Sequence, residues 1–199
     1  MEHYFTNNEN LKSEFRTIDY KYNNFELSFL SDLGVFSKDK IDYGSRFLIE
    51  TFLNNNNGTY NNVLDVGCGY GFMGITIAKV LHCHVDMVDV NKRAVHLSEI
   101  NINKNDVDAK AYVSNAYENV SDKYDLIITN PPIRAGNKIL MDILAGASEH
   151  LNEDGELWYV MRKDQGAKSF VKKLNDIYNL ELIEKSKGFY VYRAKKHWL

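Results

Sequence analysis

The segment Val63-Leu64-Asp65-Val66-Gly67-Cys68-Gly69-Tyr70-Gly71 is a short apolar strand followed directly by a glycine-rich turn. Residues 73–80 continue with the apolar spacing of a helix, so the turn joins a strand to a helix. Glycines there let the backbone approach a ligand closely, and the N-terminus of the helix adds a favourable dipole. Because ligands of open α/β sheets bind at the carboxyl ends of strands, the segment predicts a binding site at this turn.

Strands and helices alternate after the turn. Further strands are predicted at residues 84–88, 109–113, 124–129 and 157–161, and helices at 92–103, 138–150 and 169–178. Residues 180–183 and 189–192, joined around Lys187-Gly188, predict a closing antiparallel pair. This alternation predicts a doubly wound, mostly parallel α/β sheet.

The N-terminal part has a different pattern. Residues 18–22 and 25–29 each alternate between apolar and polar, and Asn23-Asn24 between them supplies a turn, which predicts a β-hairpin. We therefore predict a small β appendage over residues 1–34 and one α/β domain over residues 35–199. For Tyr20, Tyr22 and Phe25, packing in the hairpin core is favoured over stacking on RNA.

Composition limits the possible classes of protein. A chain of 199 residues with 44% hydrophobic residues can bury one large core, and its net charge of -3 gives no global basic field for nucleic acid. Two cysteines indicate a reducing compartment. The first five residues lack signal-peptide features, and no apolar run approaches the ~20 residues of a membrane span. These features predict a cytoplasmic protein without membrane contact.

Two acidic residues indicate which ligand the turn binds. Asp89 ends the next strand, where its carboxylate can accept hydrogen bonds from both ribose hydroxyls. A dinucleotide motif requires a third glycine where this chain has Phe72. Asp65 precedes the turn, and a carboxylate suits a cationic amino-acid group but repels a pyrophosphate. S-adenosylmethionine carries an ammonium and a sulfonium and no phosphate, so it is the predicted cofactor.

A second motif, Asn130-Pro131-Pro132-Ile133, follows the strand at 124–129 and contains the chain's only two prolines. Proline lacks an N–H and restricts the preceding residue to extended conformations, so the strand must end here. The motif presents the Asn130 amide and nearby backbone carbonyls as acceptors. Alone it fits a simple turn, but together with the glycine turn it predicts a catalytic device.

With both motifs present, the chain resembles the class I S-adenosylmethionine-dependent methyltransferases. It is most similar to the small-subunit ribosomal RNA guanine-N2 methyltransferase family, in a form with one methyltransferase domain. The resemblance covers most of the chain, and it rests on Gly34-Val35-Phe36-Ser37, Asp42-Tyr43-Gly44-Ser45, Asp65 to Gly71, Asp89, and Asn130 to Ile133. It implies a Rossmann-like seven-stranded sheet with a C-terminal antiparallel hairpin and a small N-terminal β appendage.

The resemblance also implies roles for residues and a substrate. Gly67, Gly69 and Gly71 would contact the methionine part of the cofactor, Asp89 the ribose and Asn115 the adenine. Phe36 and Asp42 match the segment that, in the family, lies over the entrance to the cofactor and substrate site. The implied substrate is ribosomal RNA, free or in an assembling small subunit. Relatives commonly carry a base-stacking aromatic where this chain has Ile133. Some relatives also have a second, degenerate methyltransferase-like half, for which we expect no room in these 199 residues.

The predicted chemistry is methylation of an exocyclic amino nitrogen, with guanine N2 of small-subunit ribosomal RNA as the target. The Asn130 side-chain oxygen and the Pro131 carbonyl would accept the two N–H bonds of the amine. Alternatives are methylation of a protein glutamine amide or another small planar amine, and a non-catalytic module that binds S-adenosylmethionine or adenosine. The glycine spacing disfavours a nicotinamide-dependent oxidoreductase.

Other candidate sites have weaker support. In His82-Cys83-His84 neighbouring side chains point to opposite faces, so we predict no metal site. Cys68 lacks the partners of a nucleophile. Arg134 and Lys138 flank the Asn-Pro-Pro motif, where they could contact phosphates; solvated surface charge is an equally favoured interpretation. A local positive bias at the C-terminal end is weak evidence for a docking face; its residues are Lys185, Lys187, Arg193, Lys195 and Lys196.

Overall fold

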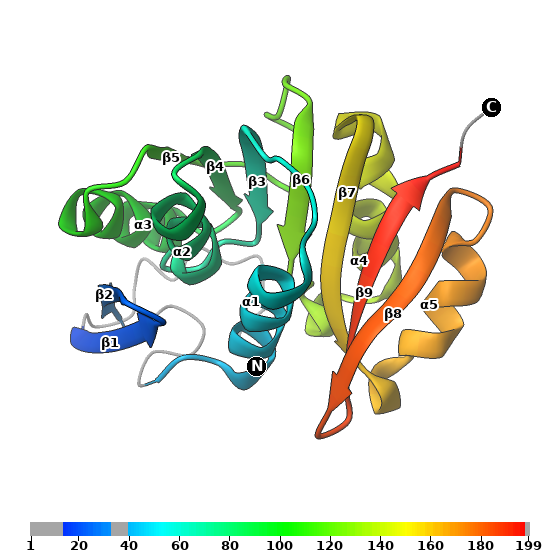
Figure 1. Cartoon of the computed structure of the whole chain (residues 1–199), viewed down its shortest axis with the longest axis horizontal. Helices are drawn as coiled ribbons and strands as arrows, with labels where there is room; N and C mark the ends of the chain where they lie inside the picture. The colour runs from blue at the N-terminus through cyan, green and yellow to red at the C-terminus, as the bar shows by residue number, and fades with distance from the viewer. Residues whose placement is uncertain (1–13, 33–39, 198–199) are drawn as a thin grey trace.

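The protein was analysed as a computed structural model, which describes residues 14–32 and 40–197. These residues form a central sheet of seven strands in the order β5-β4-β3-β6-β7-β9-β8 (Figure 1). Strands β3 to β7 run parallel, whereas β9 is antiparallel to both of its neighbours. The strands are β3 (Asn62–Val66), β4 (His84–Asp89), β5 (Ala109–Val113), β6 (Tyr124–Thr129), β7 (Leu151–Arg162), β8 (Tyr178–Ser186) and β9 (Phe189–Lys196). The predicted fold class is confirmed.

The strand order reverses between β3 and β6. The chain continues from β3 to β4 and β5 on one side, and from β6 to β7 on the other. In register, Val66 at the end of β3 pairs with Val88 of β4 and with Thr129 of β6. The residues that follow these three strands therefore lie together at the reversal point, which is the usual ligand site of such sheets.

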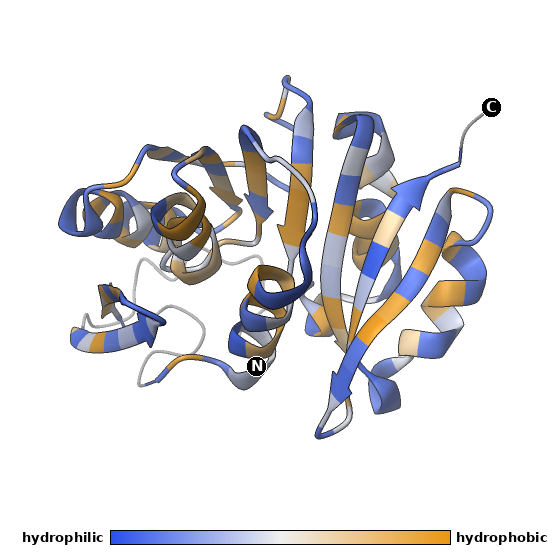
Figure 2. Cartoon of the chain, in the orientation of Figure 1, coloured by the Kyte–Doolittle hydropathy of each residue, from blue (hydrophilic) through white to orange (hydrophobic). Residues whose placement is uncertain are grey.

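Helices cover both faces of the sheet, and each side buries a hydrophobic cluster. Helices α1 (Tyr43–Asn55), α2 (Phe72–Leu81) and α3 (Lys92–Asn105) pack on one face, and α4 (Asn137–Gly146) and α5 (Ala167–Leu174) pack on the other. Strand β6 contributes to both clusters and is almost continuously buried around its apolar segment at 126–128, whereas the edge strand β8 mixes apolar and polar residues and is largely exposed (Figure 2). Within the described residues, no helix is long and apolar enough to cross a membrane.

Three predicted boundaries were wrong. Helix α4 ends at Gly146 and continues as a 3-10 turn over Ala147–His150, whereas a single helix was expected over 138–150. Helix α5 ends at Leu174, because Tyr178 already pairs with Lys196 as the first residue of β8. Strand β7 begins at Leu151, whereas a strand was expected over 157–161. Its pairing with β6 shifts in register between Tyr124 and Leu126, and the polar residues at 152–154 give no strand pattern in the sequence.

The N-terminal hairpin is confirmed as β1 (Arg16–Tyr22) and β2 (Phe25–Ser31). Its inward residues belong to the same hydrophobic cluster as α2, and the Tyr20 ring contacts that of Phe72 edge-on at 4.9 Å. Tyr20 is thus a core residue, as predicted. The expected boundary at residues 34 and 35 lies outside the described residues, so the division into two parts stays a prediction.

Two buried asparagines of α3 attach the hairpin to the domain. Asn105 accepts a hydrogen bond from the Ser28 N–H (3.1 Å) and donates one to the Ser28 carbonyl (2.9 Å). Asn101 does the same with Leu30, at 2.7 and 3.0 Å. It also donates to the Tyr70 carbonyl at 2.7 Å, inside the glycine turn. The two side-chain amides therefore satisfy backbone N–H and C=O groups of β2 that would otherwise need a neighbouring strand.

Asn101→Ala is expected to lower the free energy of unfolding by about 2–4 kcal/mol, because it leaves buried backbone groups of Leu30 and Tyr70 without partners. Urea denaturation followed by circular dichroism would measure the loss. The control is Asn103→Ala on the exposed side of the same helix, for which a change within about 0.5 kcal/mol is expected. Equal effects of the two substitutions would contradict this role of Asn101.

Candidate active site

The glycine turn between β3 and α2 is held by β4 and α3. Gly67, Gly69 and Gly71 have φ angles of +75°, +57° and +97°, which lie in the left-handed region that favours glycine. The Val88 carbonyl accepts hydrogen bonds from the N–H groups of Gly67 and Cys68, both at 2.9 Å. The Ser98 hydroxyl donates to the Gly69 carbonyl at 2.8 Å. The turn is therefore fixed in shape by the protein itself.

Asp89 is placed beside this turn by the pairing of β3 with β4. Its Oδ2 accepts a hydrogen bond from the Gly69 N–H and its Oδ1 accepts one from the Asn91 N–H, both at 2.9 Å. The carboxylate is buried, and burial raises its pKa above the ordinary value although these bonds oppose the rise. Each oxygen keeps a lone pair that can accept a hydroxyl group.

A hollow next to Asp89 brings several predicted residues together. Gly67, Asp89, Asn115 and Pro132 all line it. Ser114, Ala116 and, from α4, Ile139 and Ile143 line it as well. The sequence predicted only a helix at 138–150 for the two isoleucines, because nothing in their spacing distinguishes the wall of a pocket from the core. The hollow has a polar end at Asp89 and an apolar wall, as a nucleoside site requires.

Asp65 is fully buried just before the turn. Its Oδ2 accepts a hydrogen bond from the Gly74 N–H at 2.9 Å, while its Oδ1 has no partner among the described residues. Burial raises the pKa of this carboxyl to about 7, with a smaller contribution from the charge of Asp89. A buried carboxyl is stabilised either by a proton or by a neighbouring cation, and the free Oδ1 is an acceptor suited to the ammonium of an amino-acid group.

Asn130 follows β6 at the other side of the reversal point. Its Nδ2 donates hydrogen bonds to Asp42 Oδ2 and to Ser45 Oγ, both at 3.0 Å. These bonds fix the orientation of the amide and leave its Oδ1 without a partner among the described residues. The Pro131 carbonyl is also without a protein partner in the described part of the chain, whereas the Pro132 carbonyl accepts from the Ala135 N–H. Two consecutive residues therefore each have an acceptor without a partner among the described residues.

Asp42 and Ser45 place Asn130 against the start of α1. Asp42 Oδ2 caps the helix by accepting the Ser45 N–H at 3.0 Å, so one carboxylate oxygen holds both the helix and the amide. Sequence reasoning expected Asp42 over the cofactor mouth and did not assign Ser45 to the site. Phe36 lies outside the described residues.

Ile133 begins the 3-10 turn η1 (Ile133–Ala135) directly after the two prolines. Its side chain is half-buried and packs against the cluster on the α4 side.

Cys68 is buried beside Ser98, and burial raises the pKa of its thiol well above the ordinary value, which opposes a nucleophilic role. The ring nitrogens of His84 are bonded to Asp108 and Asp86, at 2.9 and 2.7 Å.

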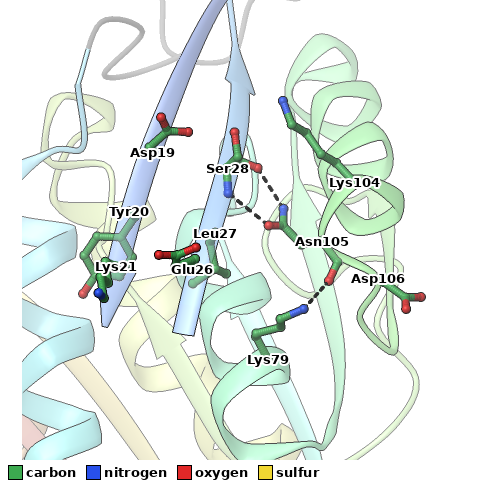
Figure 3. A pocket seen from close by; sticks show the side chains of 10 residues that line it. All are labelled: Asp19, Tyr20, Lys21, Glu26, Leu27, Ser28, Lys79, Lys104, Asn105 and Asp106. Atoms are coloured by element: carbon green, nitrogen blue, oxygen red, sulfur yellow. Dashed lines mark hydrogen bonds between the residues drawn. The ribbon is translucent and has the colours of Figure 1, made fainter. Parts of the chain in front are cut away.

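Another hollow lies between the hairpin and the C-terminal ends of α2 and α3 (Figure 3). Side chains of both signs line it, including Asp19, Lys21, Glu26 and Lys104. Helix α2 has 10 residues, so this end lies about 15 Å from the glycine turn at its other end. The hollow is therefore separate from the site built by Asp65, Asp89 and Asn130.

The chain matches known sequences over most of its length. A family model described as methyltransferase small domain matches residues 26–193. A Bacillus subtilis protein named "Uncharacterized protein YbxB" is 40% identical, and the match covers 98% of each chain. Ribosomal RNA small subunit methyltransferase C of Buchnera aphidicola is 33% identical over 81% of this chain. The match covers 48% of that relative, so the chain spans about half the length of the relatives with this name.

Solved structures show the same fold. The 16S rRNA N2 guanine methyltransferase RsmC of Thermus thermophilus, solved with AdoMet and guanosine, superposes with a TM-score of 0.81 at 23% identity. The match covers 94% of this chain and 52% of that one. A ribosomal protein L11 methylase of Lactobacillus delbrueckii gives a TM-score of 0.69 at 20% identity, over 81% of this chain and 87% of that one. Both likenesses concern the fold.

Proposed function

The chain belongs to the methyltransferase small domain family, and from this premise we infer that it methylates an exocyclic amino nitrogen, namely guanine N2 of small-subunit ribosomal RNA. The observation that carries this inference is a pair of acceptors at the Asn-Pro-Pro motif, Asn130 Oδ1 and the Pro131 carbonyl, which have no partner among the described residues; Asp42 and Ser45 fix the orientation of the Asn130 amide. The relatives named as ribosomal RNA small subunit methyltransferase C support the substrate class.

The proposed cofactor is S-adenosylmethionine, which when bound supplies an electrophilic methyl group on a sulfonium. The glycine turn and the unpaired oxygen of Asp65 would receive its amino-acid part. Asp89 would accept hydrogen bonds from the ribose, and Asn115 would contact the adenine at the apolar side of the hollow. Phe36 and Asp42 are proposed to belong to the segment that covers this mouth.

The Asn-Pro-Pro motif is proposed to orient the amine. An exocyclic amino group is a poor nucleophile, because its lone pair is delocalised into the ring. Asn130 Oδ1 and the Pro131 carbonyl would accept its two N–H bonds, which directs the lone pair towards the methyl group and stabilises the positive charge that develops on nitrogen. Methyl transfer would form a nitrogen–carbon bond as the carbon–sulfur bond of the bound sulfonium breaks, and the methylated nitrogen would release one proton to solvent. Ile133 is proposed to cover one face of the base by apolar contact.

The proposed substrate is ribosomal RNA, free or in an assembling small subunit in the cytoplasm. A base in RNA must be unpaired or flipped before its amino group can enter the site. With a net charge of -3, the protein has no global field that attracts RNA, so binding would depend on local positive charges.

Deletion of the gene is expected to remove N2-methylguanosine from one position of small-subunit ribosomal RNA. Mass spectrometry of nucleosides and of RNA fragments from the deletion strain and its parent would detect the loss. A plasmid copy should restore the methyl group, and a copy carrying Asn130→Ala should not. If the RNA is unchanged and a methylated glutamine disappears from a protein, the proposed substrate is wrong and the amide alternative holds.

A further inference from the structure

Aromatic and basic side chains gather beside the Asn-Pro-Pro motif in a group that we call the Tyr43 cluster: Tyr43, Arg46, Arg162, Lys187 and Phe189. The rings of Tyr43 and Phe189 are 5.4 Å apart. Lys187 Nζ lies 4.7 Å and the Arg46 guanidinium 5.8 Å from the Tyr43 ring centre. The Arg162 guanidinium lies 5.6 Å from the ring centre of Phe189. Three cations therefore surround two neighbouring rings.

The topology of the sheet explains this gathering. Strand β9 is antiparallel to β7, and Phe189 at its start pairs with Arg162 at the end of β7. The turn between β8 and β9 therefore reaches the same edge of the sheet as the end of β6, near the start of α1 (Figure 1). The Tyr43 hydroxyl joins the two parts through a 2.9 Å hydrogen bond with Ser186 Oγ.

Gly44 lies close to both the Tyr43 cluster and Asn130. A methyl group added at Gly44 would lie 3.0 Å from Phe189 Cε1 and 3.4 Å from Asn130 Nδ2. The Phe189 ring and the Asn130 amide therefore both lie close to Gly44, which places the ring near the proposed substrate site. Phe189 and Tyr43 are half-buried, so part of each ring stays accessible.

The charges of the cluster are incompletely neutralised. Arg162 pairs with Asp164 at 2.8 Å, but neither Arg46 nor Lys187 forms an ion pair with any described residue. Both side chains are exposed. In a protein whose net charge is -3, two unpaired cations beside the active site form a local anion-binding surface.

We propose that the Tyr43 cluster binds the RNA strand next to the target guanine, with Arg46 and Lys187 on its phosphates and the Phe189–Tyr43 pair against a flanking base. Proteins bind single-stranded nucleic acid by this combination of cations along the backbone and aromatic rings under the bases. The cluster would supply the aromatic surface that Ile133 does not provide. This inference rests on the proposed function, because it assumes an RNA substrate.

The salt dependence of RNA binding tests the two cations. Affinity for a fluorescein-labelled, guanine-containing single strand of about twelve nucleotides is measured by anisotropy over a series of salt concentrations. Each lost phosphate contact reduces the slope of log K against log salt by about 0.7, so Arg46→Gln/Lys187→Gln should reduce it by about 1.4. The control Lys123→Gln/Lys172→Gln removes the same charge from exposed positions outside the cluster and should preserve the slope.

Phe189→Leu tests the aromatic surface. Leucine keeps an apolar contact with Tyr43 but removes the ring, and RNA affinity should fall about tenfold at constant salt slope. Phe189→Tyr should restore it. The affinity for S-adenosylhomocysteine, measured by calorimetry, should stay within about twofold in all these variants, which shows that the site remains folded.

The outcomes separate the two proposals. If the wild-type protein binds and methylates RNA but the cluster and control variants have equal salt slopes, or if Phe189→Leu binds as tightly as wild type, the inference about the cluster is wrong and the proposed function stands. If the wild-type protein binds no RNA and methylates a protein amide, both are wrong. The inference is supported if the salt slope is reduced in Arg46→Gln/Lys187→Gln but not in the control, and if Phe189→Leu lowers the affinity for RNA.

Discussion

Asn130→Ala is expected to lower the rate of methyl transfer by about 10²–10³-fold, while the affinity for S-adenosylhomocysteine changes by less than about twofold. Alanine removes the side-chain acceptor that would orient the amine, but the Pro131 carbonyl remains. The cofactor would be held by the glycine turn, Asp89 and Asp65; within the part of the chain that the structure describes, none of them is hydrogen-bonded to Asn130. Single-turnover transfer of a labelled methyl group to unmodified ribosomal RNA gives the rate, and calorimetry gives the affinity.

Two further variants sharpen this prediction. Asp42→Ala removes one of the two groups that fix the Asn130 amide, so the rate should fall by less than in Asn130→Ala, and the lost helix cap should cost about 1 kcal/mol of stability. Asn137→Ala changes an exposed asparagine at the start of α4 and should leave both quantities unchanged. A wild-type rate in Asn130→Ala would refute its role in orienting the substrate.

The parts of the site that lie at strand ends could be predicted from the sequence. Asp65, Asp89 and Asn130 each end or follow an apolar run, and parallel strands bring their carboxyl ends to one edge. The order of the strands was not needed for this prediction. It required only that the three runs belong to one parallel sheet.

Contacts between distant segments could not be predicted. Asp42 and Asn130 are 88 positions apart in the sequence. Nothing in the pattern of either segment indicates that the Asp42 carboxylate accepts a hydrogen bond from the Asn130 side-chain amide. Asparagine side chains on a helix are usually exposed to solvent. Asn101 and Asn105 of α3 are instead buried, because they form hydrogen bonds with the backbone of β2. Phe189 appears in the sequence only as a strand residue, and its place beside Gly44 depends on the antiparallel return of β9.

Asp65→Asn is expected to change the pH dependence of stability. The pKa of the buried carboxyl is about 7 in the folded protein and about 3.9 in the unfolded chain, so between these values the folded state holds a proton that the unfolded state has lost. Stability of the ligand-free wild type therefore falls as pH rises through this window and is level above it. Relative to the variant, the wild type should lose about 2–3 kcal/mol between about pH 5 and pH 8.

The same substitution should weaken cofactor binding. A cation bound beside Asp65 favours the charged carboxylate, so the wild-type affinity for S-adenosylhomocysteine should increase as pH rises through about 7. Asparagine is uncharged and cannot form an ion pair with the ammonium of the cofactor. The variant should bind at least about tenfold more weakly at pH 8, since hydrogen bonds to charged groups contribute about 1.5–3 kcal/mol, and its affinity should vary little with pH.

Urea denaturation of the ligand-free protein and calorimetry with S-adenosylhomocysteine, each at three pH values, measure both effects. The control Asp106→Asn changes an exposed carboxyl at the end of α3, where asparagine also accepts the left-handed backbone, and should alter neither quantity. The two effects have opposite directions above pH 7: the variant gains stability relative to the wild type and loses affinity. A general disturbance of the turn would lower both, so a variant that is less stable and binds less tightly at every pH would contradict the assignment of Asp65 to the cationic end of the cofactor.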